Sequence, residues 1–191
     1  RLLSGAEVAD AMWLDALEAQ MAESGAAIIE ARGRMMAALA LQLENLPPGL
    51  FAVPAIGLEN TASATAAELA DAWRNGRRRD ASAGRTLIGP HRADLVVHNR
   101  ANNQAADRSS TGEQKALLLS LILAHAALVT EQRGTPPILL LDEIAAHLDP
   151  ARRTALFERL RVTGAQVWMT GTEPSLFDGI GPAAELVAVG A

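Results

Sequence analysis

The sequence predicts an α/β protein with a parallel sheet, joined to an α-rich lobe. Residues 1–84 carry mainly helical periodicity, whereas residues 85–191 show helix and strand patterns in the order helix, strand, helix, strand. That order is typical of helices that cover parallel strands. Composition agrees, because 49% of the 191 residues are hydrophobic and only 3% are aromatic, which indicates a core of aliphatic side chains. We therefore expect two domains, divided near residue 84.

The predicted lobe begins with a long helix. A capping box at Ser4 and Glu7 opens a run of apolar residues at helical spacing that reaches about Asn45. The run predicts one helix, or two helices that break near Gly25. The features expected after it are a stop at 47–49, an extended stretch at 50–58, a helix at 65–76 and a boundary at 79–84.

Alternating polar and apolar residues open the second region and predict a hairpin around a polar turn at 101–103. A long apolar helix follows, and then four aliphatic residues that are typical of a buried strand. The elements expected here are strands at 94–100 and 104–108, a helix at 112–129, a strand at 138–141, a helix at 150–160 and a strand at 166–170.

Composition also excludes several classes of protein. The chain has no cysteine, which excludes disulfides, thiolate zinc sites and cysteine nucleophiles. The longest apolar run, Leu117–Val129, holds 13 residues, fewer than the roughly 20 that a bilayer-spanning helix needs. The first residues carry neither an initiator Met nor a secretory signal. We expect a cytoplasmic chain without a membrane segment, cut from a longer protein.

Arginine is locally clustered in a chain whose net charge is −5. That balance argues against a surface that is basic throughout, but neutralising phosphates needs only local positive charge. Arg77, Arg78 and Arg79 stand together and are therefore candidate contacts to DNA. The alternative is an ordinary solvated face.

Two acids follow the aliphatic run at 138–141. A strand buried on both faces would place Asp142 and Glu143 at its C-terminal end, where open parallel sheets bind ligands. In P-loop ATPases an aspartate at this point helps hold Mg²⁺, and a following glutamate accepts a proton from the attacking water. The alternative is a buried strand that meets solvent with two acids.

A helix start lies about 30 residues before the acids. Ser110 and Glu113 form a capping box around Gly112, and a capped helix alone explains these residues. The same free N–H groups, helix dipole and hydroxyl also make an anion site. Asp149, six residues beyond Glu143, is likewise either an N-cap before a proline or part of a nucleotide site. The order and spacing of the three pieces favour the nucleotide site.

Together these motifs resemble the RecF family of ABC-type ATPases. The matching stretches are LIGPHRADL, SSTGEQKALLLSLILAHAALV, PPILLLDEIAAHLDPARRTALFERL and QVWMTGTE. The resemblance implies the C-terminal part of an ABC-type ATPase head, and residues 1–84 suit the family's α-rich lobe. The roles that it implies are the signature loop for Ser110 and Gly112, the Walker B magnesium residue for Asp142, the general base for Glu143, the D-loop for Asp149 and the γ-phosphate sensor for Thr172.

One motif of such ATPases is missing. No G-x-x-x-x-G-K-[ST] occurs, so this sequence lacks the loop that cradles the β-phosphate. In the family that loop lies near the N-terminus of the full protein. We therefore expect the chain to hold one half of a split ATPase head, to lack the main nucleotide grip, and to be inactive alone.

The resemblance further implies an ATP-driven dimeric clamp of recombinational and replication-gap repair and of the SOS response, with slow ATP hydrolysis in the full-length dimer. Thr172 stands where transporter-type ABC ATPases carry a switch histidine, and a hydroxyl fits slow turnover. The implied cofactors are ATP and Mg²⁺. The implied partners are duplex DNA near single-strand gaps, a second copy of the chain, and the RecR and RecO mediators.

Three alternatives stand beside this interpretation. One is a catalytically inert ABC-like module kept for dimerisation or interaction, although the motif residues are intact. Another is the head of a different SMC-like ATPase, which would need long heptad arms. The third is a metal site at His91, Asp94 and His98, but strand alternation puts only the last two on one face.

Overall fold

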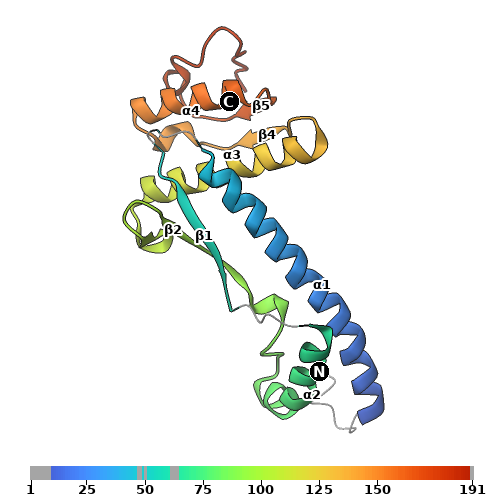
Figure 1. Cartoon of the computed structure of the whole chain (residues 1–191). Helices are drawn as coiled ribbons and strands as arrows, with labels where there is room; N and C mark the ends of the chain where they lie inside the picture. The colour runs from blue at the N-terminus through green and yellow to red at the C-terminus, as the bar shows by residue number, and fades with distance from the viewer. Residues whose placement is uncertain (1–9, 47–48, 50, 61–64, 190–191) are drawn as a thin grey trace. The chain divides into compact units, whose positions relative to one another are not determined.

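The computed structural model describes residues 10–46, 49, 51–60 and 65–189, and it has the predicted α/β class (Figure 1). Its helices and strands are α1 (Ala11–Glu44), β1 (Pro54–Glu59), α2 (Ala66–Ala83), β2 (Asp94–Asn99), β3 (Gln104–Ala105), α3 (Thr111–Arg133), β4 (Leu139–Leu141), α4 (Pro150–Val162) and β5 (Val167–Met169). Short 3₁₀ turns lie at Pro90–Arg92, Ala106–Arg108, Ala145–His147 and Pro174–Phe177.

The chain forms two compact units that interleave along the sequence. Unit 1 draws on Arg1–Ala38 and Ile56–Val96, and unit 2 on Leu39–Ala55 and Val97–Ala191. Each unit has its own hydrophobic cluster. The domain boundary expected near residue 84 stays a prediction.

Of the two alternatives for the first helix of the predicted lobe, the structure has the single helix. The second helix is longer than the sequence pattern indicates. Helix α1 runs unbroken past Gly25, whereas the capping box predicted at its start lies outside the described residues. Helix α2 begins at the N-cap Thr65 and ends at Gly84, which has the left-handed φ of 64°. The end predicted at Gly76 is wrong, because Gly76 is buried inside α2.

A small cluster of buried side chains holds unit 1 together. Ala22 of α1 packs with Leu69 and Trp73 of α2, and the Trp73 indole N–H donates to the carbonyl of Ile88 at 2.7 Å. Gly25 allows this close approach, because a Cβ there would lie 3.1 Å from Leu69 Cδ1. The glycine that the sequence pattern treats as a possible helix break is therefore a packing residue.

Substitution at Gly25 should destabilise unit 1. Gly25→Val should lower the free energy of unfolding by about 1–3 kcal/mol, because the added methyl groups overpack the contact with Leu69 and Trp73. Gly33→Val is the matched control in the same helix, since a Cβ at Gly33 would meet nothing within 4 Å. Urea denaturation of both variants measures the difference. Equal stability of the two variants would contradict this account of Gly25.

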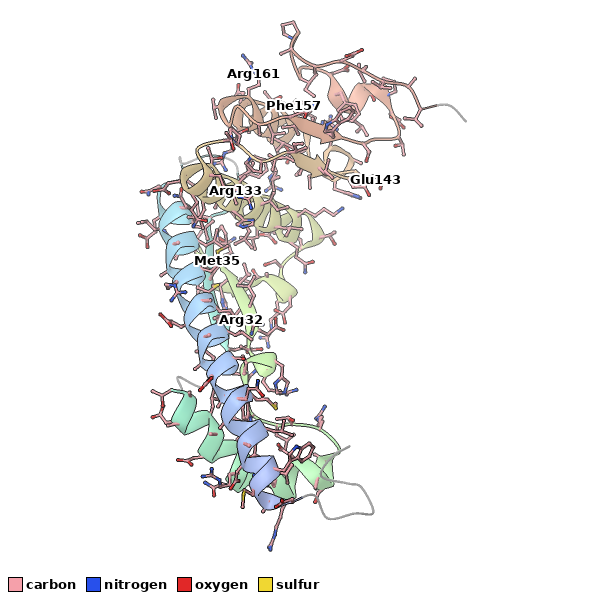
Figure 2. The ribbon with its side chains drawn as sticks, turned by 90° about the vertical axis from the view of Figure 1, so that its right-hand side faces the viewer. Arg32, Met35, Arg133, Glu143, Phe157 and Arg161 are labelled. Atoms are coloured by element: carbon pink, nitrogen blue, oxygen red, sulfur yellow. The ribbon has the colours of Figure 1, made fainter. Side chains whose placement is uncertain are left out.

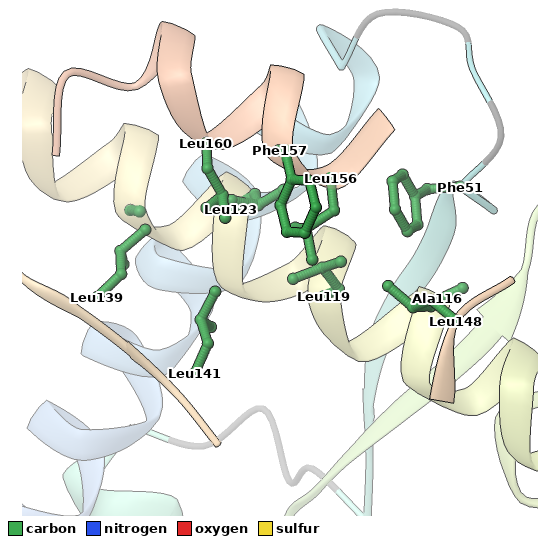
Figure 3. Packing of buried hydrophobic residues seen from close by; sticks show 11 residues of the cluster. Phe51, Ala116, Leu119, Leu123, Leu139, Leu141, Leu148, Leu156, Phe157 and Leu160 are labelled. Atoms are coloured by element: carbon green, nitrogen blue, oxygen red, sulfur yellow. The ribbon is translucent and has the colours of Figure 1, made fainter. Parts of the chain in front are cut away.

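Unit 2 is built around α3. One face of α3 presents Leu119 and Leu123 to Leu156 and Phe157 of α4, as Figure 3 shows. Leu139 and Leu141 of β4 complete the same cluster. Ser120 is also buried on α3, and its hydroxyl donates to the carbonyl of Ala52 at 2.9 Å.

Helix α3 is the one described helix that is long and apolar enough to cross a membrane by length and composition. It has 23 residues, more than the 13 of the apolar run counted in the sequence. Core helices of water-soluble proteins pass the same test, and α3 packs its buried leucines against α4 and β4. Its hydrophobicity is consistent with a helix that packs in the core of unit 2.

The predicted hairpin is present, with a shorter returning strand. Strands β2 and β3 pair antiparallel, with His98 opposite Ala105 and Asn99 opposite Gln104. The returning strand stops at Ala105 because residues 106–108 form a 3₁₀ turn. This turn leads directly to the start of α3.

Strands β4 and β5 form the predicted parallel pair, with Leu139 beside Val167 and Leu141 beside Met169. The prediction that β4 is buried on both faces is wrong. Leu139 and Leu141 are buried, but Leu140 is 76% exposed. Successive side chains of a strand point to opposite faces, and among the described residues α3 and α4 supply core on one face only.

Candidate nucleotide site

The two predicted acids lie at the carboxyl end of β4. Asp142 and Glu143 follow Leu141 directly, and both are exposed. The neighbouring strand β5 ends alongside, because the Thr170 N–H donates to the Leu141 carbonyl at 3.1 Å. Glu143 is labelled at this turn in Figure 2. The parallel pairing thus brings one residue of β5's end next to both acids.

Thr170 joins the two acids through its hydroxyl. Its Oγ1 accepts a hydrogen bond from the Glu143 N–H at 3.0 Å and donates one to Asp142 Oδ1. A threonine hydroxyl has a single hydrogen and two lone pairs, so both bonds form together. The three residues make one hydrogen-bonded turn.

The turn holds Glu143 in an uncommon backbone conformation. Its φ is 48°, in the left-handed region that residues with a Cβ usually avoid at a cost of about 1–2 kcal/mol. Such backbone strain clusters at functional sites. The conformation sets the direction in which the Glu143 side chain leaves the strand end.

Ser110 caps α3 as its sequence pattern predicts. Its hydroxyl accepts from the Glu113 N–H at 3.4 Å and donates to Glu113 Oε2 at 2.8 Å, and the Ser110 N–H donates to the same oxygen at 2.9 Å. The hydrogen bonds from Ser110 lower the pKa of Glu113. The capping box therefore satisfies two N–H groups at the helix start, those of Ser110 and Glu113.

Among the described residues, nothing requires position 112 to be glycine on steric grounds. A Cβ at Gly112 would meet Arg152 Nη1 at 3.8 Å, which is an ordinary van der Waals distance. Its φ lies outside the left-handed region. Packing among the described residues therefore leaves room for a side chain at position 112.

Arg152 brings the start of α3 and the start of α4 together. Asp149 is the N-cap of α4, where it accepts from the Arg152 N–H at 2.9 Å, and its Oδ2 lies 3.5 Å from Arg152 Nε. The Arg152 charge also contributes to the lowered pKa of Glu113, after the hydrogen bonds from Ser110. The predicted residues thus form two groups, one at Asp142 and Glu143 and one at Ser110, Gly112 and Asp149.

Thr172 lies in the exposed loop after β5, two residues beyond Thr170. Gly171 between them allows this loop to pack closely, because a Cβ there would lie 2.9 Å from the Phe177 ring. The assignment of Thr172 as a phosphate sensor stays a prediction.

The alternative metal site has no support from the geometry. Within the residues that the structure describes, no cluster of three or more His, Asp or Glu side chains could hold a metal ion. His91 instead lies with Nε2 3.0 Å from the Thr86 carbonyl.

The three predicted DNA-contacting arginines differ in their surroundings. Arg77 bridges α2 to α1 by donating to both oxygens of Glu18, at 2.8 and 2.6 Å, and to Asp15 at 2.6 Å. The hydrogen bonds to Glu18 and Asp15 raise the pKa of Arg77. The hydrogen bonds that Asp15 accepts from Arg77 and Arg74 lower the pKa of Asp15. Arg78 and Arg79 are exposed. Arg77 is thus occupied by carboxylates, whereas its two neighbours face solvent.

Sequence reasoning did not find two residues of the site, Thr170 and Arg152. Thr170 carries a readable signal, because parallel pairing of the two predicted strands places its position beside Asp142. Arg152 carries none beyond its place in the first turn of α4.

Comparison with known proteins agrees with the fold and the motifs. A family model described as AAA domain, putative AbiEii toxin, Type IV TA system, matches residues 7–170. DNA replication and repair protein RecF of Allorhizobium ampelinum is 49% identical over 189 residues, which cover 94% of this chain and 50% of the relative. The same protein of Brucella abortus is 49% identical over 192 residues, with 95% and 50% covered. The chain spans about half the length of these curated relatives.

Two solved structures share the fold. A structure of the recombination mediator protein RecF with ATP, in the RecFOR pathway, aligns with a TM-score of 0.74 at 23% identity, over 90% of this chain and 48% of that one. A second RecF structure, with ATPrS, aligns with a TM-score of 0.72 over 92% and 49%. The chain therefore belongs to the AAA-domain family over residues 7–170, and it is a homologue of RecF that spans half of a RecF chain.

Proposed function

We propose that this chain is one half of an ATP-dependent DNA-binding protein of recombinational and replication-gap repair. The observation that carries the proposal is the turn at the end of β4, where Thr170 holds Asp142 and Glu143 at the edge of a parallel sheet. Ligands of open parallel sheets bind at this edge. The names of the relatives supply the biological setting.

The donor set of this edge fits Mg²⁺ that is shared with a nucleotide. Mg²⁺ is usually bound by one or two carboxylates together with waters and substrate phosphates. Asp142 offers one exposed carboxylate, and it is proposed to hold the ion, which would neutralise phosphate charge. Glu143 is proposed to accept the proton of the attacking water, and Thr172 to hydrogen-bond the γ-phosphate. We propose that hydrolysis is slow, because the Thr172 hydroxyl cannot carry the positive charge of the histidine that transporter-type ABC ATPases have at this position.

The second group of residues is proposed to complete the site of another copy. Ser110, Gly112 and Asp149 would face nucleotide held by a second subunit, so that ATP binding drives homodimerisation. The free space at Gly112 supports this, because packing among the residues that the structure describes does not require a glycine there. The closed dimer would clamp duplex DNA near single-strand gaps.

The relatives also support proposals for the partners and the compartment. RecR and RecO are proposed as mediator partners, because the solved RecF structures are described within the RecFOR pathway. A cytoplasmic location suits a protein that works on chromosomal DNA. The SOS response is the proposed physiological context.

The chain by itself should bind MgATP weakly or not at all. It keeps both acids but has no phosphate-binding loop, which supplies most of the grip on the β-phosphate. Calorimetric titration of the 191-residue chain with MgATP should give no measurable heat at micromolar concentrations. A dissociation constant near 1 μM, or about −8 kcal/mol, would mean that the chain holds a nucleotide site of another kind.

The arginine cluster allows a second test, in a full-length protein. By this we mean the product of a complete gene that includes the chain, or the chain joined to the complementary half of the Allorhizobium relative. Replacing Arg78 and Arg79 by Ala should reduce the log–log salt slope of ATP-dependent DNA binding by up to about 2 units, roughly one for each phosphate that is no longer neutralised. Fluorescence anisotropy with a gapped duplex at several salt concentrations measures the slope.

Arg77→Ala is the matched comparison. It should leave the salt slope unchanged and lower the melting temperature, because it removes the bridge from α2 to Glu18 and Asp15 of α1. An unchanged slope in the Arg78 and Arg79 variant would mean that these two residues form only a solvated face. If Arg77→Ala reduces the salt slope and the Arg78 and Arg79 variant does not, the DNA contact belongs to Arg77 instead.

A further inference from the structure

We infer that Thr170 is the positioning residue of this site, whose hydroxyl orients both acids of the β4 turn for nucleotide and metal. The inference deepens the proposed function and rests on it. The hydroxyl serves Asp142 with its hydrogen and the Glu143 N–H with a lone pair. Rotation about the Thr170 side chain would break both bonds at once, so one side chain holds the Asp142 carboxylate and the Glu143 backbone N–H together.

The position of Thr170 is fixed by the sheet rather than by the loop after it. Its N–H donates to the Leu141 carbonyl at 3.1 Å, which continues the ladder that pairs Leu141 with Met169. The hydroxyl therefore starts from a strand end of defined register. A residue in the following loop, such as Thr172, has no equivalent anchor in the β4–β5 ladder.

The energetics indicate a role in orientation more than in stability. Asp142, Glu143 and Thr170 are all exposed, so water can replace either hydrogen bond. Net contributions of such bonds to folding are small, because the unfolded chain makes equivalent bonds to water. Residues that orient ligand groups have larger effects on function, and their loss typically reduces metal affinity or activity about 10–100-fold.

The backbone of Glu143 gives the bridge a further task. The left-handed φ of 48° is unfavourable for glutamate, and the Thr170 hydroxyl holds the N–H of that same residue. Without the bond, Glu143 is released to sample ordinary backbone conformations that aim its side chain elsewhere. Loss of the hydroxyl should therefore affect proton acceptance as well as the metal.

The test compares variants in the full-length protein. Thr170→Val removes the hydroxyl and keeps the shape, Thr170→Ser keeps the hydroxyl, and Thr170→Ala is a second variant without it. Thr130→Val is the control, because the Thr130 hydroxyl donates to the Ala126 carbonyl within α3, away from the acids. The readouts are ATP binding across a range of Mg²⁺ concentrations, single-turnover hydrolysis, and melting temperature.

Thr170→Val should raise the Mg²⁺ concentration for half-maximal ATP binding about tenfold and slow single-turnover hydrolysis about 10–100-fold. ATP binding without Mg²⁺ and the melting temperature should stay near those of the parent protein. Thr170→Ser should stay within about twofold of the parent in every readout, since it restores both hydrogen bonds. Thr130→Val should do the same.

Two results would overturn the inference. One is parental Mg²⁺ dependence and hydrolysis in both variants that lack the hydroxyl. The other is a loss in Thr170→Ser as large as in Thr170→Val, which would assign the effect to the methyl group. Asp142→Asn in the same assay separates the two levels of argument. If Asp142→Asn also leaves the Mg²⁺ dependence of ATP binding unchanged, the proposed function fails. If Asp142→Asn changes this dependence and the Thr170 variants do not, only the role of Thr170 fails.

Discussion

Replacing Ser110 by arginine in the full-length protein should abolish ATP-dependent dimerisation while each subunit still binds ATP. The proposed composite site places Ser110 against nucleotide held by the second subunit, and a long charged side chain there blocks the approach. The nucleotide grip of the subunit's own head does not involve Ser110, so binding survives. Sedimentation velocity with and without ATP, together with a nucleotide-binding assay, measures both properties.

Ser110→Ala separates this effect from capping. Both substitutions remove the hydroxyl that bonds Glu113, and each should cost about 1 kcal/mol of stability. Only the arginine adds bulk, so the alanine variant should dimerise with ATP far better than the arginine variant. Gly112→Ala is a second variant for the same assays, because a Cβ at Gly112 would lie at an ordinary van der Waals distance from Arg152. A folded Ser110→Arg protein that dimerises normally would require the composite-site mechanism to be abandoned.

The second large effect is expected at Glu143. Glu143→Gln in the full-length protein should slow hydrolysis by about 10²-fold or more while leaving ATP binding intact, because the amide cannot accept a proton from water. Asp142→Asn should instead weaken Mg²⁺-dependent binding. Single-turnover hydrolysis and equilibrium binding measure the two roles separately.

Glu143→Gly serves as the structural control for this prediction. Glycine adopts the φ of 48° without strain, so this variant should lose hydrolysis and keep or gain stability. The paired result would show that glutamate is present for its carboxylate and not for the turn. Equal loss of ATP binding in Glu143→Gln and Asp142→Asn would contradict the proposed division of roles.

Local patterns in the sequence predict the elements of the site well. The aliphatic run before Asp142, the capping box at Ser110 and the N-cap at Asp149 all depend on neighbours within a few positions. Each of these local features is present in the structure. Helix ends were less predictable, because Gly76 and Gly84 are both possible C-caps and only the second adopts the left-handed conformation.

Features that depend on distant residues were not predictable in the same way. The bond from Thr170 to Asp142 crosses 28 positions, and the pairing of Arg77 with Asp15 crosses 62. A cluster of arginines in sequence therefore does not reveal which member is already paired. The prediction that β4 is buried on both faces failed for a related reason. Hydrophobicity identifies an apolar strand but does not say how many of its faces the fold covers.

The bare face of the β4–β5 pair bears on how substitution scans should be read. Leu140 and Trp168 are 76% and 57% exposed in this chain, although parallel strands are usually covered on both faces. A scan for thermal stability of the chain alone would score Leu140→Ser as harmless, and a scan for solubility would favour it. The same substitution scored by DNA repair in living cells also reports contacts that Leu140 makes outside this chain. Both scans should score substitutions of the buried Leu139 and Leu141 as harmful. If Leu140→Ser is harmless for stability but harmful for repair, the leucine is needed for a contact outside this chain's own core.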